Sequence, residues 1–133
     1  MNGLLRLATL TGDARYEQPA ARWLRSMAPL LGDHPTAFAY LLGALERWLV
    51  PPLEVAIVGD RSAPETAALV AEVTGRFLPN AVHLVAAPGT GADLSPLLAD
   101  RPLVEGRPTA YVCEHFACRV PVTTPDALAA QLP

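Results

Sequence analysis

Apolar residues recur at helical spacing through the first thirty positions of the chain. A short apolar segment from Leu4 to Leu10 stops at Gly12, a residue that suits the left-handed position after a helix. A second helix is predicted from Tyr16 to Leu31, because one face of that stretch is apolar and the arginines fall mainly elsewhere. The residues on this apolar face are Tyr16, Ala20, Leu24, Met27 and Leu31.

A third helix is more apolar. It is predicted to begin near Pro35, which suits a first helical turn, and to end before Pro51-Pro52. Its apolar stripe is Ala37, Tyr40, Leu41, Ala44, Leu45 and Trp48, widened by Phe38, Leu42 and Leu49. An apolar arc this wide is covered on more than one side. We therefore expect self-association through these N-terminal helices, or their association with the rest of a larger protein.

The pattern changes after the double proline. The run Leu53 to Val58 is apolar apart from Glu54, which predicts a strand covered on both faces. A helix follows, with Ser62 and Glu65 as a capping box, and Ala81 to Ala86 predicts a second strand. Strand, helix and strand this close together predict a parallel βαβ unit. The predicted buried face of the helix is Thr66, Leu69, Val70, Val73 and Phe77.

The remaining residues predict a β-hairpin and two short helices. One helix is placed at Asp93 to Leu98, and a terminal helix begins after Thr124, a capping hydroxyl followed by proline. Between them, Thr109 to Cys113 and Ala117 to Pro121 are predicted to pair through the connection Glu114-His115-Phe116.

These elements predict an α/β fold class, with a helical segment at residues 1–50. A small βαβ plus β-hairpin sheet with flanking helices follows at residues 51–133. The chain has 133 residues, 51% of them hydrophobic, and a formal net charge of −3. These values argue against disorder and against a nucleic-acid interface, which normally has a basic face.

The longest apolar run, residues 41–50, contains charges and is far shorter than the ~20 residues of a membrane span. The first residues lack the continuous apolar stretch of a secretory signal. We therefore expect a cytoplasmic chain with no membrane contact.

The most interesting side chains are Cys113 and Cys118. Three interpretations of the pair remain open: reduced structural thiols, a reversible or structural disulfide across the predicted hairpin, or a metal site completed by His115. The spacing is not the Cys-x-x-Cys of dithiol oxidoreductases, and no second cysteine pair exists to complete four zinc ligands.

A second candidate site is the turn at Gly59, Asp60 and Arg61, between a predicted strand and helix. Backbone N–H groups at such a turn can bind a phosphate or another anion, and Gly89 would help to line the pocket. The turn has one glycine and no nucleotide-binding fingerprint, so an ordinary connection is favoured. No nucleophile elbow or zinc-protease motif is present, so we identify no catalytic residue and no cofactor.

Several motifs resemble those of a known family. They are Leu4-Leu5-Arg6-Leu7, Leu10-Thr11-Gly12-Asp13, Leu53-Glu54-Val55-Ala56-Ile57-Val58-Gly59-Asp60, Phe77-Leu78-Pro79-Asn80, Gly106-Arg107-Pro108-Thr109-Ala110-Tyr111-Val112-Cys113, and Cys118 followed by Pro121-Val122-Thr123. Together they are similar to the C-terminal region of the thioredoxin-domain-containing proteins of the YyaL and spermatogenesis-associated-protein type. The resemblance implies that residues 1–50 correspond to the last hairpins of an α/α toroid similar to those of glycosidases and sugar epimerases. The family's N-terminal thioredoxin-like domain has no counterpart in this sequence, so no catalytic residue is carried over.

The leading hypothesis is a non-catalytic C-terminal α/β module that serves assembly or regulation of a larger thioredoxin-domain-containing protein. One alternative is a dithiol redox module that uses Cys113 and Cys118. The other is a fragment that binds a small ligand, a sugar or a phosphate, around Gly59. We do not expect the chain alone to be an enzyme.

Overall fold

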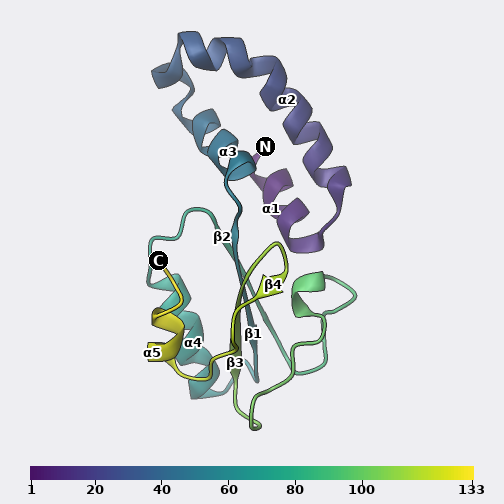
Figure 1. The fold of residues 1–133 in the computed structure, drawn as a ribbon, viewed down its shortest axis with the longest axis vertical. Helices are drawn as coiled ribbons and strands as arrows, with labels where there is room; N and C mark the ends of the chain where they lie inside the picture. Colours follow the sequence, from purple (N-terminus) through teal and green to yellow (C-terminus); the bar gives the residue numbers. More distant parts are fainter. The chain divides into compact units, whose positions relative to one another are not determined.

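A computed structural model describes all 133 residues. The chain divides into two compact units, Met1–Pro51 and Pro52–Pro133. The first unit is helical, and the second contains a four-stranded mixed sheet with helices, which confirms the α/β fold class (Figure 1). No helix combines the length and the apolar character that crossing a membrane requires.

The helical unit holds three α-helices and a short 3-10 turn. The helices are α1 (Asn2–Thr11), α2 (Ala14–Asp33) and α3 (Ala39–Leu49), and the 3-10 turn η1 spans Pro35–Phe38. Gly12 follows α1 with φ 66°, as predicted for a left-handed residue after a helix. The core of the unit is Leu5, Ala20, Leu24, Leu31, Leu41 and Ala44.

The predicted stripe on the third helix is wrong in its first part. Residues 35–38, which begin with Pro35, form a 3-10 turn, and this type of helix winds with three residues per turn. The α-helix begins only at Ala39. The change of winding takes Ala37 and Tyr40 off the buried face, and Tyr40 is 79% exposed. Leu41 and Ala44 are buried as expected, while Phe38 and Leu42 are half-buried.

The second unit is built on a sheet with strand order β2-β1-β3-β4. The strands are β1 (Leu53–Val58), β2 (Ala81–Ala86), β3 (Thr109–Glu114) and β4 (Ala117–Cys118). Strand β1 pairs in parallel with β2 and antiparallel with β3, and β3 pairs antiparallel with β4. The parallel βαβ unit and the hairpin are thereby confirmed, but the second hairpin strand, predicted at Ala117 to Pro121, ends at Cys118. The other elements are α4 (Pro64–Thr74), η2 (Pro96–Leu98) and α5 (Pro125–Ala129).

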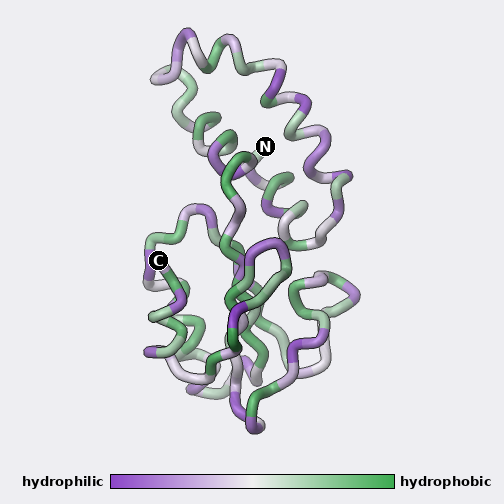
Figure 2. The backbone as a smooth tube through the Cα atoms, viewed as in Figure 1, coloured by the Kyte–Doolittle hydropathy of each residue, from purple (hydrophilic) through white to green (hydrophobic).

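Both faces of this sheet are covered. Helices α4 and α5 lie on one face, and the loop that carries η2 lies on the other (Figure 1). The core under the helices includes Val55, Ile57, Leu69, Val112 and Leu128. The core under the loop consists of Ala56, Val58, Leu97, Tyr111 and Cys113. Figure 2 shows that the tip of the β3–β4 hairpin is hydrophilic.

Two local predictions for α4 are wrong. The residue before the helix is Ala63, which makes no side-chain capping bond, so Ser62 and Glu65 do not form a capping box. Instead, the N–H and the hydroxyl of Ser62 both donate to Oδ1 of Asp60, a local turn that competes with capping. Phe77 lies beyond the end of the helix and is 90% exposed.

Candidate functional site: the disulfide hairpin

A two-residue turn joins β3 to β4. Glu114 pairs directly with Ala117, so His115 and Phe116 alone make the turn. Both have positive φ, 50° and 62°, as in the tight turns that match the twist of a hairpin. Left-handed conformations of residues other than glycine cost about 1–3 kcal/mol each and persist only where surrounding contacts hold them. Contacts with surrounding residues therefore hold His115 and Phe116 in these conformations, which their own residue types do not favour.

A disulfide joins Cys113 of β3 to Cys118 of β4. The two residues are directly opposed in the strand register, with their Cα atoms 3.9 Å apart. Of the three interpretations of the cysteine pair, the structure therefore agrees with the disulfide. Cys113 is 1% exposed, whereas Cys118 is half-buried, so the two cysteines differ in exposure.

The metal hypothesis for Cys113, His115 and Cys118 does not match this state of the pair. A metal binds the thiolate form of cysteine, and both sulfurs are used in the bond. No group of three or more His, Cys, Asp or Glu side chains in the chain is arranged to hold a metal ion.

Glu54 is the functional candidate that sequence reasoning missed. It pairs with Cys113 across β1 and β3, and Cys113 pairs with Cys118 across β3 and β4. Directly opposed residues project from the same face of a sheet, so the three residues form one row across three strands. Glu54 is only 2% exposed. The available signal was a single carboxylate inside a strand that is otherwise apolar.

The carboxylate of Glu54 also holds the turn. Its Oε2 accepts a hydrogen bond of 2.7 Å from the backbone N–H of Phe116. Burial raises the pKa of the Glu54 carboxyl above its ordinary value, and the hydrogen bond from Phe116 opposes that rise. The charge of His115 also lowers this pKa, and that of Glu114 raises it.

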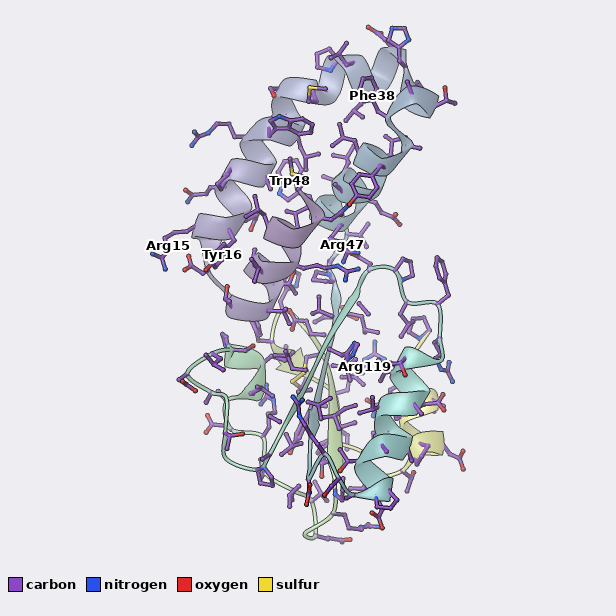
Figure 3. The ribbon with its side chains drawn as sticks, turned by 180° about the vertical axis from the view of Figure 1, so that it is seen from behind. Arg15, Tyr16, Phe38, Arg47, Trp48 and Arg119 are labelled. Atoms are coloured by element: carbon purple, nitrogen blue, oxygen red, sulfur yellow. A yellow bond between two sulfur atoms is a disulfide. The ribbon has the colours of Figure 1, made fainter.

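Two arginines connect the hairpin to other parts of the chain. Arg119 (Figure 3) donates from Nη1 to the carbonyl of Gln131 over 2.7 Å and from Nη2 to Oε1 of Glu114 over 3.3 Å. The guanidinium of Arg101 lies 5.4 Å from the centre of the Tyr111 ring and donates to the carbonyl of Phe116 over 3.5 Å. These contacts tie the hairpin to α5 and to the loop that covers the sheet.

The second predicted site, at Gly59, Asp60 and Arg61, uses its polar groups internally. The N–H of Gly59 donates to the carbonyl of Ala86 over 2.9 Å, and Nη2 of Arg61 donates to the carbonyl of Val85. Asp60 accepts from Ser62, and these hydrogen bonds lower the pKa of its carboxyl. These contacts fit the ordinary strand-to-helix connection that the sequence favours.

Packing explains the glycine in this turn. A Cβ at position 59 would lie 2.5 Å from Oγ1 of Thr66 and 3.0 Å from Cβ of Pro108. Glycine is therefore required here by close contact, without any ligand.

A separate apolar pocket lies in the helical unit. Its volume is about 460 Å³, and its lining is Met1, Trp23, Ala37, Phe38, Tyr40 and Leu41. Elsewhere in this unit, Nε1 of Trp48 (Figure 3) donates to Oε1 of Glu17 over 3.1 Å, and the guanidinium of Arg25 lies 4.9 Å from the centre of the Trp48 ring. The lining side chains are apolar or aromatic and include no Asp, Glu, His or Arg, so the pocket suits an apolar partner rather than a charged ligand.

Comparison with known proteins places this two-unit α/β chain among the relatives of one mammalian protein. It is distantly homologous to a segment of spermatogenesis-associated protein 20. The identity is 33% over 130 residues with the human protein and 31% over 130 residues with the rat protein. In each comparison the alignment covers 96% of this chain but only 16% of the relative. No family model and no solved structure matches the chain.

Proposed function

We propose that this chain is a non-catalytic α/β module that serves the assembly or regulation of a thioredoxin-domain-containing protein related to spermatogenesis-associated protein 20. The homology supports the relationship, because almost the whole chain aligns with a small part of a much longer relative. The proposal assigns no reaction to the chain alone, and it assigns the cytoplasm as its compartment.

The observation that carries the assembly role is the exposed apolar surface of the helical unit. Large apolar side chains are exposed at six positions in Met1–Pro51, namely Leu7, Trp23, Leu30, Tyr40, Leu49 and Val50. The larger α/β unit exposes three, namely Phe77, Leu94 and Val120. Trp23 and Tyr40 also line the apolar pocket. Exposed aromatic side chains beside an apolar pocket are typical of an interaction surface.

Sedimentation velocity at micromolar concentration tests this role. The wild-type chain is expected to self-associate, because burying these side chains removes apolar area from water. The double variant Trp23→Ser/Tyr40→Ser is expected to be monomeric. Phe77→Ser removes a more exposed aromatic ring from the other unit and is expected to behave as the wild type does. A monomeric wild-type chain would overturn self-association through the helices.

A second candidate function is thiol–disulfide exchange at Cys113 and Cys118. The observation in its favour is the pairing of a half-buried sulfur with a buried one in the same disulfide. Exchange requires a thiolate to reach one sulfur, and Cys118 is accessible enough to be reached. In the cytoplasm most protein thiols are kept reduced, so this pair would respond to oxidation.

Equilibration of the chain with glutathione buffers of graded potential tests this second function. The disulfide and the dithiol are expected to interconvert reversibly, with both thiols counted by alkylation and mass. Cys118→Ser is the control and is expected to show no two-electron transition. A bond that stays intact in strongly reducing dithiol buffer would refute the exchange function.

A further inference from the structure

We propose that Glu54 transfers a proton to and from Sγ of Cys113 when the Cys113–Cys118 pair undergoes thiol–disulfide exchange. The proposal rests on the exchange function given above and adds the group that handles the proton. It stands on the row of Glu54, Cys113 and Cys118 across three adjacent strands.

Burial makes a protein group necessary for this proton. Cys113 is 1% exposed and Glu54 2% exposed, so bulk water does not reach the sulfur freely. A thiolate released at Cys113 would be a charge in an apolar site beside Ala56, Val58 and Leu97. Such a charge is costly unless it is neutralised. Glu54 is the ionisable residue paired directly with Cys113 in the sheet.

The other polar groups around the row are engaged elsewhere. The hydroxyl of Tyr111 donates to the carbonyl of Pro102, and Arg101 donates to the carbonyl of Phe116. Glu114 is bonded to Arg119 at the surface, and His115 is exposed in the turn. Glu54 accepts a bond at Oε2 from the backbone N–H of Phe116. One carboxyl oxygen can therefore hold the turn while the other carries the proton.

The difference in exposure decides which sulfur is attacked. A thiolate of an incoming dithiol attacks Sγ of Cys118, the half-buried sulfur, and forms a new S–S bond with it. The Cys113–Cys118 bond breaks, its electron pair goes to Sγ of Cys113, and the carboxyl of Glu54 delivers a proton there. The second thiolate of the reductant then attacks the reductant's own sulfur in the mixed disulfide and releases the Cys118 thiolate.

The step balances as a two-electron exchange. The incoming dithiol is oxidised to its disulfide, and the protein disulfide is reduced to two thiols. Cys118 and the Glu54 carboxylate take their protons from solvent. In the reverse direction the Glu54 carboxylate removes the proton from Cys113 as this sulfur attacks the mixed disulfide at Cys118. The burial that raises the pKa of Glu54 brings its proton affinity closer to that of a thiol.

Glu54→Gln separates proton transfer from support of the turn. The amide oxygen of glutamine can still accept the bond from the N–H of Phe116, and the two side chains have nearly the same volume. The rate of disulfide reduction by dithiothreitol is measured over acid to neutral pH and divided by the thiolate fraction of the reductant. For the wild-type chain, this corrected rate is expected to rise as pH falls through the pKa of Glu54. Glu54→Gln is expected to lose that dependence and to react about tenfold more slowly, a modest effect for general acid catalysis.

Glu114→Gln is the matched control, because it removes an exposed carboxylate next to the same turn. It is expected to keep a reduction rate that rises as pH falls, with the midpoint moved to lower pH because the charge of Glu114 raises the pKa of Glu54. If Glu54→Gln also keeps a pH-dependent corrected rate of wild-type size, while the wild-type disulfide exchanges reversibly, the proton role of Glu54 is overturned and the exchange function stands. If the wild-type bond does not exchange, the exchange function fails first.

A measurement on the wild-type chain covers the case in which Glu54→Gln does not fold. The carboxyl carbon of Glu54 is titrated by NMR in the oxidised and the reduced chain. A proton shared with the Cys113 sulfur requires the pKa of Glu54 to differ between these two states. Equal titration in both states would overturn the proposal.

Discussion

Reduction of the Cys113–Cys118 bond should weaken the α/β unit by a limited amount. The bond closes a ring between residues only five positions apart, so it removes little freedom from the unfolded chain. Loop-closure entropy for a ring of this size amounts to about 2 kcal/mol at 25 °C. Reduction removes no packing atoms, and the bond from Phe116 to Glu54 still holds the turn. We therefore expect a loss of about 2 kcal/mol, or roughly 10 °C in Tm for a domain of this size.

The assay must measure the stability of the α/β unit, Pro52–Pro133. Both tryptophans, Trp23 and Trp48, lie in the helical unit, so tryptophan fluorescence does not serve. Hydrogen exchange of the β3 amides in urea, with and without a phosphine reductant, measures the free energy of unfolding locally. Cys118→Ser should be insensitive to the reductant. Global unfolding on reduction would show that the bond is essential to the fold, and an unchanged free energy would show that loop entropy has no effect here. Either outcome would refute the reasoning.

Three further predictions concern single side chains. The raised pKa of Glu54 means that the folded state favours the protonated carboxyl. The free energy of unfolding of the wild-type chain should therefore fall as pH rises from 4.5 through that pKa, and that of Glu54→Gln should not. Urea titrations at several pH values check this. Gly59→Ala should destabilise the chain by about 1–3 kcal/mol because its Cβ would meet Thr66 and Pro108, whereas Gly43→Ala, on an open face of α3, should stabilise it by up to about 1 kcal/mol; thermal unfolding compares them. Thr124→Ala should cost about 1 kcal/mol because its hydroxyl caps α5, and Ser62→Ala should cost less because Ser62 caps no helix; equilibrium denaturation of both variants tests the difference.

The sequence predicted β1 and β2 well, because short apolar runs bounded by proline and glycine have few alternatives. The observed bounds of β1 and β2 are those expected from Leu53 to Val58 and from Ala81 to Ala86. Errors arose where a local alternative was available. Ser62 bonds with Asp60 instead of capping α4, and a 3-10 turn before α3 exposes Tyr40.

Only part of the candidate site could be predicted from the sequence. A close pairing of Cys113 with Cys118 follows from a tight hairpin, and the structure has it. The place of Glu54 beside them depends on the antiparallel register of β1 and β3, strands that lie almost sixty residues apart in the chain. No local pattern contains that register, since it results from the packing of the whole unit.

Strand β4 is only two residues long and is covalently clipped to its neighbour. It lies at an edge of the sheet, where a long flat strand would offer unpaired backbone groups to another molecule. Strand β4 is too short to start such pairing with another molecule. This edge of the sheet therefore resists growth from chain to chain by strand addition.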